Sequence, residues 1–129
     1  MGYLIVFLGA GLGGACRHGV NLMGLRLLGS GFPWGTLTVN ICGSLLMGIL
    51  AGWGALAGNL PQELRLFLAT GLLGGFTTFS AFSLDVVLLW ESGRAGLAVL
   101  YALGSMILSI AGLFLGLAVM RTLAAGAGG

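Results

Sequence analysis

Charged side chains are scarce in this chain of 129 residues: only 6% are acidic or basic, and lysine is absent. Soluble globular domains carry about 25% charged residues, so the scarcity excludes an ordinary soluble fold. The formal net charge of +2 is too small to indicate nucleic-acid binding. The chain has two cysteines, Cys16 and Cys42, both in apolar segments, and we expect packing residues rather than a disulfide or metal pair.

Apolar residues make up 58% of the chain and occur in long continuous runs. A membrane β-barrel requires alternating apolar and polar residues, which these runs exclude. A bilayer crossing needs about 20 apolar residues, so the length holds four helices and short loops but no separate soluble domain. We predict an all-α integral membrane protein with a single four-helix transmembrane domain over residues 1–129, whose spans are about 3–28, 34–53, 62–90 and 95–120.

The stretch Gly71–Phe82, GLLGGFTTFSAF, lies inside the third apolar run but is poorly suited to a helix. Gly74 and Gly75 each disfavour a helix interior by about 1 kcal/mol against Ala, and two β-branched threonines follow. Irregular backbone at membrane depth persists only where it faces protein, water or an ion. We therefore predict that the third helix is broken mid-membrane, after a start at Asn59, Leu60 and Pro61, and that the freed carbonyls bind something.

Two helical faces carry polar side chains at every fourth position: Thr36, Asn40 and Ser44 in the second span, and Tyr101, Ser105 and Ser109 in the fourth. Hydrogen bonds within or between helices account for the hydroxyls. An amide at mid-membrane depth needs several partners, which favours a pore or binding role for Asn40.

Other residues leave two readings open. Arg17 lies past the middle of the first span and either snorkels or lines a functional site. Phe79 and Phe82 share one helix face, where packing and function are both possible. Asp85 lies toward the far interface, where we expect a solvated carboxylate. Gly9 and Gly13 have the spacing of a close helix contact.

The remaining arginines are balanced, with Arg26 and Arg94 on one side of the membrane and Arg65 and Arg121 on the other. The positive-inside rule then gives no preferred orientation, so subunits can pair antiparallel about a two-fold axis. Such pairing brings two copies of the break together at mid-depth. A cage of carbonyl oxygens without carboxylates suits a monovalent cation.

Three motifs carry a resemblance to a known family: Gly13–Gly14 with Arg17, GTLTVNICGS from Gly35 to Ser44, and GLLGGFTTFSAF. Over essentially its whole length the chain resembles the CrcB/Fluc family of fluoride channels. His18 departs from the pattern, which has an aromatic residue such as Tyr there.

The resemblance implies a non-enzymatic, dual-topology antiparallel homodimer in the cell (inner) membrane, with two fluoride pores and one structural Na⁺. The Na⁺ is then held by the backbone carbonyls of Gly74 and Thr77 of both subunits. The implied fluoride pathway comprises Asn40, Phe79, Phe82, Tyr101, Ser105 and Ser109, with Thr36, Thr78 and Arg17 as further candidates. Fluoride, the lipid bilayer and a second copy of the chain are the expected partners.

Two other classes compete with this reading. A small dual-topology multidrug/proton antiporter needs a membrane-embedded carboxylate, usually in the first helix, and the first acidic residue here is Glu63. A non-transporting four-helix assembly subunit accounts for the glycines and the pairing, but not for the aligned Asn, Ser and Thr side chains.

Overall fold

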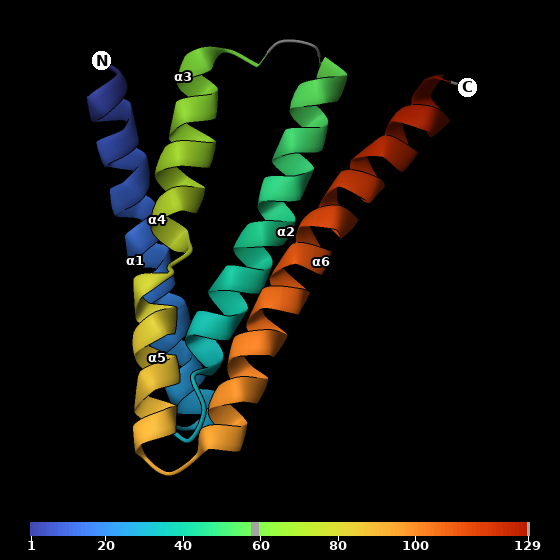
Figure 1. The fold of residues 1–129 in the computed structure, drawn as a ribbon. Coiled ribbons are helices and arrows are strands. Elements are labelled where there is room, and N and C mark those ends of the chain that lie inside the picture. Colours follow the sequence, from blue (N-terminus) through green and yellow to red (C-terminus); the bar gives the residue numbers. More distant parts are fainter. Residues whose placement is uncertain (58–59, 129) are drawn as a thin grey trace.

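The computed structural model describes residues 1–57 and 60–128 of the chain, so Asn59 lies outside the described residues. Within them, four helical segments are long and apolar enough to cross a membrane. They are α1 (Gly2–Leu28), α2 (Trp34–Ala57), the composite segment Gln62–Glu91, and α6 (Ala95–Gly128). This confirms the predicted all-helical architecture of four apolar spans. The segments alternate in direction, and both termini lie at the same end of the molecule (Figure 1).

The last helix is longer than its apolar run indicates. α6 continues past Met120, where the predicted span ends, because alanines are favourable in a helix and three of them follow there. Along much of its length α6 packs on α2, and glycines permit the close approach. A Cβ on Gly48 would collide with the carbonyl of Leu113, and one on Gly116 with the carbonyl of Leu45.

The third segment is built from four pieces, α3 (Gln62–Arg65), η1 (Leu66–Leu73), α4 (Gly74–Phe76) and α5 (Ser80–Glu91). Pro61 directly precedes α3, and Glu63 lies in its first turn, where a carboxylate favours the positive end of the helix dipole. η1 is wound as a π-helix, and the N–H of Gly74 donates to the carbonyl of Ala69, five residues back. π-helical winding is rare and is frequently found at functional sites. Nothing in the residue types predicted it.

α1 lies against η1 and α4 at a distance that only glycine permits. A Cβ on Gly9 would lie 2.7 Å from the Phe67 carbonyl oxygen, and one on Gly13 would overlap the Leu72 carbonyl. The close helix contact predicted from the spacing of these two glycines is therefore present. It holds the third segment against α1 up to the point where the helix breaks.

Buried apolar side chains gather near the end of the molecule that carries the α1–α2 and α5–α6 connections. Leu89, Ala98 and Tyr101 form the centre of this cluster, and Phe32 and Phe82 pack against it. Most other large apolar side chains are exposed in the single chain, as expected for surfaces that meet lipid or a second subunit.

Candidate functional site

The third segment loses its helical winding at Thr77, which has an extended backbone (φ −82°, ψ 159°), and regains it at Ser80. The break predicted from the stretch Gly74–Thr78 is therefore present, although the two glycines that favoured it, Gly74 and Gly75, remain helical. Gly75 serves a different purpose: a Cβ there would lie 2.5 Å from the carbonyl oxygen of Ala10, so glycine permits the contact with α1. Within the predicted stretch, the interruption itself begins at the threonines.

The amide of Asn40 on α2 holds the broken backbone in place. Its Nδ2 donates to the Thr78 carbonyl at 3.0 Å, and its Oδ1 accepts from the Thr78 N–H at 2.8 Å. α2 reaches the break because a side chain is absent at Gly43, where a Cβ would collide with Cγ2 of Thr77. Asn40 thus replaces, for one residue, the hydrogen bonds that the helix no longer supplies.

Two backbone N–H groups at the break are diverted from their helical acceptors. In a continuous α-helix the Thr78 N–H bonds the carbonyl of Gly74, but here it bonds Asn40. The Ala81 N–H would likewise bond the carbonyl of Thr77, but it donates to Oγ1 of Thr78 at 3.2 Å. As a result, the carbonyls of Gly74 and Thr77 lose the N–H donors that a continuous helix would give them. These are the two carbonyls that the family resemblance assigns to Na⁺.

The donor set of these two residues consists of neutral oxygens, which is the chemistry expected of a site for a monovalent cation rather than a divalent one. Both residues line the cavity described below, and neutral carbonyls are hard oxygen ligands without the charge that divalent ions require. Among the described residues there is no group of three His, Cys, Asp or Glu side chains able to hold a metal ion.

Arg17 contacts the break from the side of α1. Its Nε donates to the carbonyl of Gly75 at 3.2 Å, and the side chain is partly buried. The guanidinium does not line the cavity. In the single chain Arg17 braces the backbone, so the carbonyls of Gly75 and Thr78 are each bonded by a side chain from a neighbouring helix.

A cavity of about 780 Å³ opens beside the break, between α2, α5 and α6. It brings together most of the residues predicted for the site: Asn40, Gly74, Thr77, Thr78, Phe79, Phe82, Ser105 and Ser109. Ser44 also lines the cavity, although it was not among the predicted site residues. Its position one turn from Asn40 on the same helix face could have identified it. Ser105 is only 4% exposed, yet its Oγ has no hydrogen-bond partner among the described residues.

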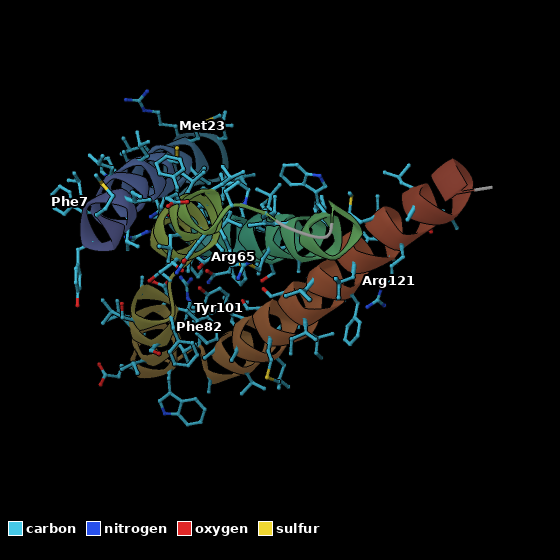
Figure 2. The ribbon with its side chains drawn as sticks, turned by 90° about the horizontal axis from the view of Figure 1, so that it is seen from above. Phe7, Met23, Arg65, Phe82, Tyr101 and Arg121 are labelled. Carbon is cyan, nitrogen blue, oxygen red and sulfur yellow. The ribbon has the colours of Figure 1, made fainter. Side chains whose placement is uncertain are left out.

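The two phenylalanines of the break differ in their surroundings. Their ring centroids are 5.7 Å apart. The ring of Phe79 is 79% exposed, whereas Phe82 is partly buried and packs 5.3 Å from the ring of Tyr101. Phe82 and Tyr101 lie in the space between α5 and α6 (Figure 2). An exposed aromatic ring at membrane depth is a surface that lipid or another protein chain can cover.

Two predicted site residues, Thr36 and Tyr101, are buried outside the cavity. The hydroxyl of Tyr101 donates to Oδ2 of Asp85 at 3.1 Å. Asp85 is partly buried, and its bond to Tyr101 was not part of the expectation for this carboxylate. Sequence reasoning missed the pair because the two residues lie on different helices and share no spacing pattern.

The comparisons with known proteins agree on one family. Residues 4–117 match the family described as "CrcB-like protein, Camphor Resistance (CrcB)". The chain is 54% identical over 123 residues to "Fluoride-specific ion channel FluC 2" of Nitrobacter hamburgensis, covering 95% of this chain and 99% of the relative. It is 61% identical over 118 residues to "Fluoride-specific ion channel FluC" of Methylobacterium nodulans, covering 92% and 94%. With matches along nearly its whole length, the chain belongs to the CrcB-like protein family.

Proposed function

We propose that this protein is a fluoride-selective ion channel that exports cytoplasmic fluoride down its electrochemical gradient. The observation that carries the proposal is the cavity at the break, where the unpartnered hydroxyl of Ser105 lies with Ser109 and the Asn40 amide. None of the described residues that line this cavity carries a full charge. The names of the relatives, each called a fluoride-specific ion channel, support the same activity.

The chemistry of the lining suits a small, strongly hydrated anion. A selective pore must replace the hydration shell with strong donors, yet it must not hold the ion so firmly that it cannot leave. Hydroxyls and an amide N–H donate without the fixed charge that would trap an anion. Asn40 Nδ2 has two hydrogens and gives one to Thr78, so the second remains for the ion. The edges of Phe79 and Phe82 carry positive partial charge and complement an anion.

The working assembly in this proposal is an antiparallel homodimer in the inner membrane, with two pores. Phe79 lines the cavity and its ring is exposed in the single chain, and a second copy that covered this ring would complete the cavity. The arginines other than Arg17 divide two against two between the ends of the spans, which removes the usual preference for one orientation. Gly74 and Thr77 of both copies would hold a central Na⁺, which when bound supplies positive charge to compensate the exposed carbonyl oxygens.

A proton-coupled drug antiporter is the less suitable reading. Such a mechanism requires an embedded carboxylate that exchanges protons with the substrate. α1 contains none, and Asp85 on α5 is engaged by the Tyr101 hydroxyl. The relatives are named channels rather than transporters.

The test is anion efflux from liposomes that contain the purified protein, with fluoride and chloride as internal anions. We expect fluoride to leave rapidly and chloride to be retained. Replacing Na⁺ by a large organic cation on both sides should abolish the fluoride efflux if the carbonyls of Gly74 and Thr77 require a bound cation. Equal release of both halides, or release of neither, contradicts the assignment.

A further inference from the structure

The polar face of α6 runs beyond the cavity and ends beneath a layer of aromatic rings. Ser109 and Ser105 line the cavity, and Tyr101 follows one helical turn later. Tyr101 is only 1% exposed. The ring of Phe82 covers it from the cavity side, and the ring of Phe32 packs edge to face on it with centroids 5.3 Å apart.

The rings continue from there to the end of the molecule. Phe32 also contacts Trp34 at the start of α2, with centroids 4.6 Å apart. Leu89 and Ala98 fill the remaining space beside Tyr101 and are themselves buried. An anion that follows the hydroxyls of α6 therefore meets a layer of apolar side chains between Tyr101 and the connections of this end, beside the Asp85 carboxylate that accepts from Tyr101. Such layers block ions because water does not enter them.

Of the rings in this layer, Phe32 differs because it lies in a loop and not in a helix. Phe82 and Tyr101 are on helices, α5 and α6, whereas Phe32 lies in the connection between α1 and α2. That connection begins at Gly29, whose φ of 81° favours glycine. Nη1 of Arg94, at the α5–α6 turn, donates to the carbonyl of Gly31 at 2.8 Å and fastens the connection to the opposite loop. A loop held by few contacts opens at lower free energy than packed helices do.

We propose that the Phe32 side chain is a movable stopper, that is, a ring that blocks this end of the fluoride path. Arg94 keeps it in the blocking position through its hydrogen bond to the Phe32 loop. The inference rests on the proposed channel function and adds two residues that limit the rate of fluoride flow. Withdrawal of the Phe32 ring uncovers Tyr101 and admits water beside its hydroxyl. The free hydroxyls of the track, those of Ser109 and Ser105, are then connected to solvent past the Tyr101 ring, whose own hydroxyl donates to Asp85. Discrimination between halides stays at the cavity, which Phe32 does not line.

The experiment measures initial fluoride efflux from liposomes with the wild-type protein and four variants. Phe32→Ala removes the ring, and Phe32→Leu keeps most of its volume. Arg94→Ala removes the hydrogen bond to Gly31 without touching the rings. Phe7→Ala is the matched control, because Phe7 is 73% exposed on α1 and points away from the bundle (Figure 2).

Phe32→Ala should raise the initial fluoride rate roughly threefold or more, because an apolar constriction is removed from the path. Arg94→Ala should raise it in the same direction, whereas Phe32→Leu and Phe7→Ala should stay near the wild-type rate. Chloride should remain trapped in every case. A wild-type or reduced rate in Phe32→Ala overturns the stopper, and if that variant does not fold, an unchanged rate in Arg94→Ala does so. Fluoride retention by the wild-type protein overturns the proposed function, and this inference with it.

Discussion

The side chain of Asn40 forms a closed ring with the backbone of Thr78, because its amide both donates to and accepts from that residue. This pairing takes the Thr78 N–H away from the Gly74 carbonyl, so one side chain sets the geometry of both the anion cavity and the proposed cation ligands. The break is thus stabilised by a side chain of α2 and does not depend only on the low helix propensity of its own residues. Predictions for neighbouring residues follow from it.

Removal of the Ser105 hydroxyl should impair transport without weakening the fold. Its buried Oγ has no partner among the described residues, and burying an unpaired hydroxyl costs about 1–3 kcal/mol. Ser105→Ala should therefore leave the unfolding temperature in detergent unchanged or higher, while fluoride efflux falls by about tenfold. The control is Ser83→Ala, whose hydroxyl lies outside the cavity and donates to the carbonyl of Phe79, the residue that precedes α5. Full fluoride efflux in Ser105→Ala excludes this hydroxyl from the path.

Replacement of Arg17 by lysine should loosen the break while keeping the charge. The guanidinium Nε donates to the Gly75 carbonyl, and an ammonium on a flexible stem does not reproduce that planar contact. We expect Arg17→Lys to require a several-fold higher Na⁺ concentration for half-maximal fluoride efflux, because the adjoining Gly74 carbonyl is less well positioned. Arg26→Lys, at an exposed site near the end of the same helix, should behave as the wild type. An unchanged Na⁺ dependence in Arg17→Lys would show that the bond from Arg17 to Gly75 does not affect cation binding.

Two glycines of α1 should respond in opposite ways to the same methyl group. A Cβ on Gly13 overlaps the Leu72 carbonyl and lies 2.8 Å from the Phe76 nitrogen, whereas one on Gly11 meets no atom within 4 Å. Gly13→Ala should force α1 away from the third segment and lower the stability by about 1–3 kcal/mol. Gly11→Ala should be neutral or stabilising by up to about 1 kcal/mol, since Ala is the better helix former. Thermal unfolding in detergent measures both, and equal shifts would contradict the packing.

The orientation of the chain in the membrane can be measured with one introduced cysteine. Replacing Cys16 and Cys42 by alanine gives a background in which Thr122→Cys, exposed near the C-terminus, is the sole thiol. If the two orientations are equally populated, an impermeant thiol reagent added outside intact cells should label roughly half of the protein. Complete labelling, or none, would contradict dual topology.

The sequence predicted the features that depend on composition and spacing. Four apolar runs predict four spans, and the four-residue period placed Asn40 and Ser44 on one face and Ser105 and Ser109 on another. The presence of a break in the third segment was also predicted correctly.

The features that depend on contacts between helices were not predictable from one segment at a time. Gly75 looked like a helix breaker, but its role is contact with α1 at Ala10. We expected only solvent around Asp85, because nothing in the sequence of α5 shows that Tyr101 lies beside it. The π-helical winding of η1 has no compositional signature, since the residue types of this segment also suit an α-helix.

Fluoride efflux from liposomes with Asn40→Ala, compared with the wild type and with Thr38→Ala, tests the central claim most directly. Thr38 is an exposed neighbour on α2, whose hydroxyl donates to the Trp34 carbonyl within the helix. We expect Asn40→Ala to elute as a folded protein of wild-type size and to release fluoride about tenfold more slowly or worse, since the amide donor and the clamp on Thr78 are both lost. Wild-type efflux from folded Asn40→Ala would show that fluoride does not pass through this cavity.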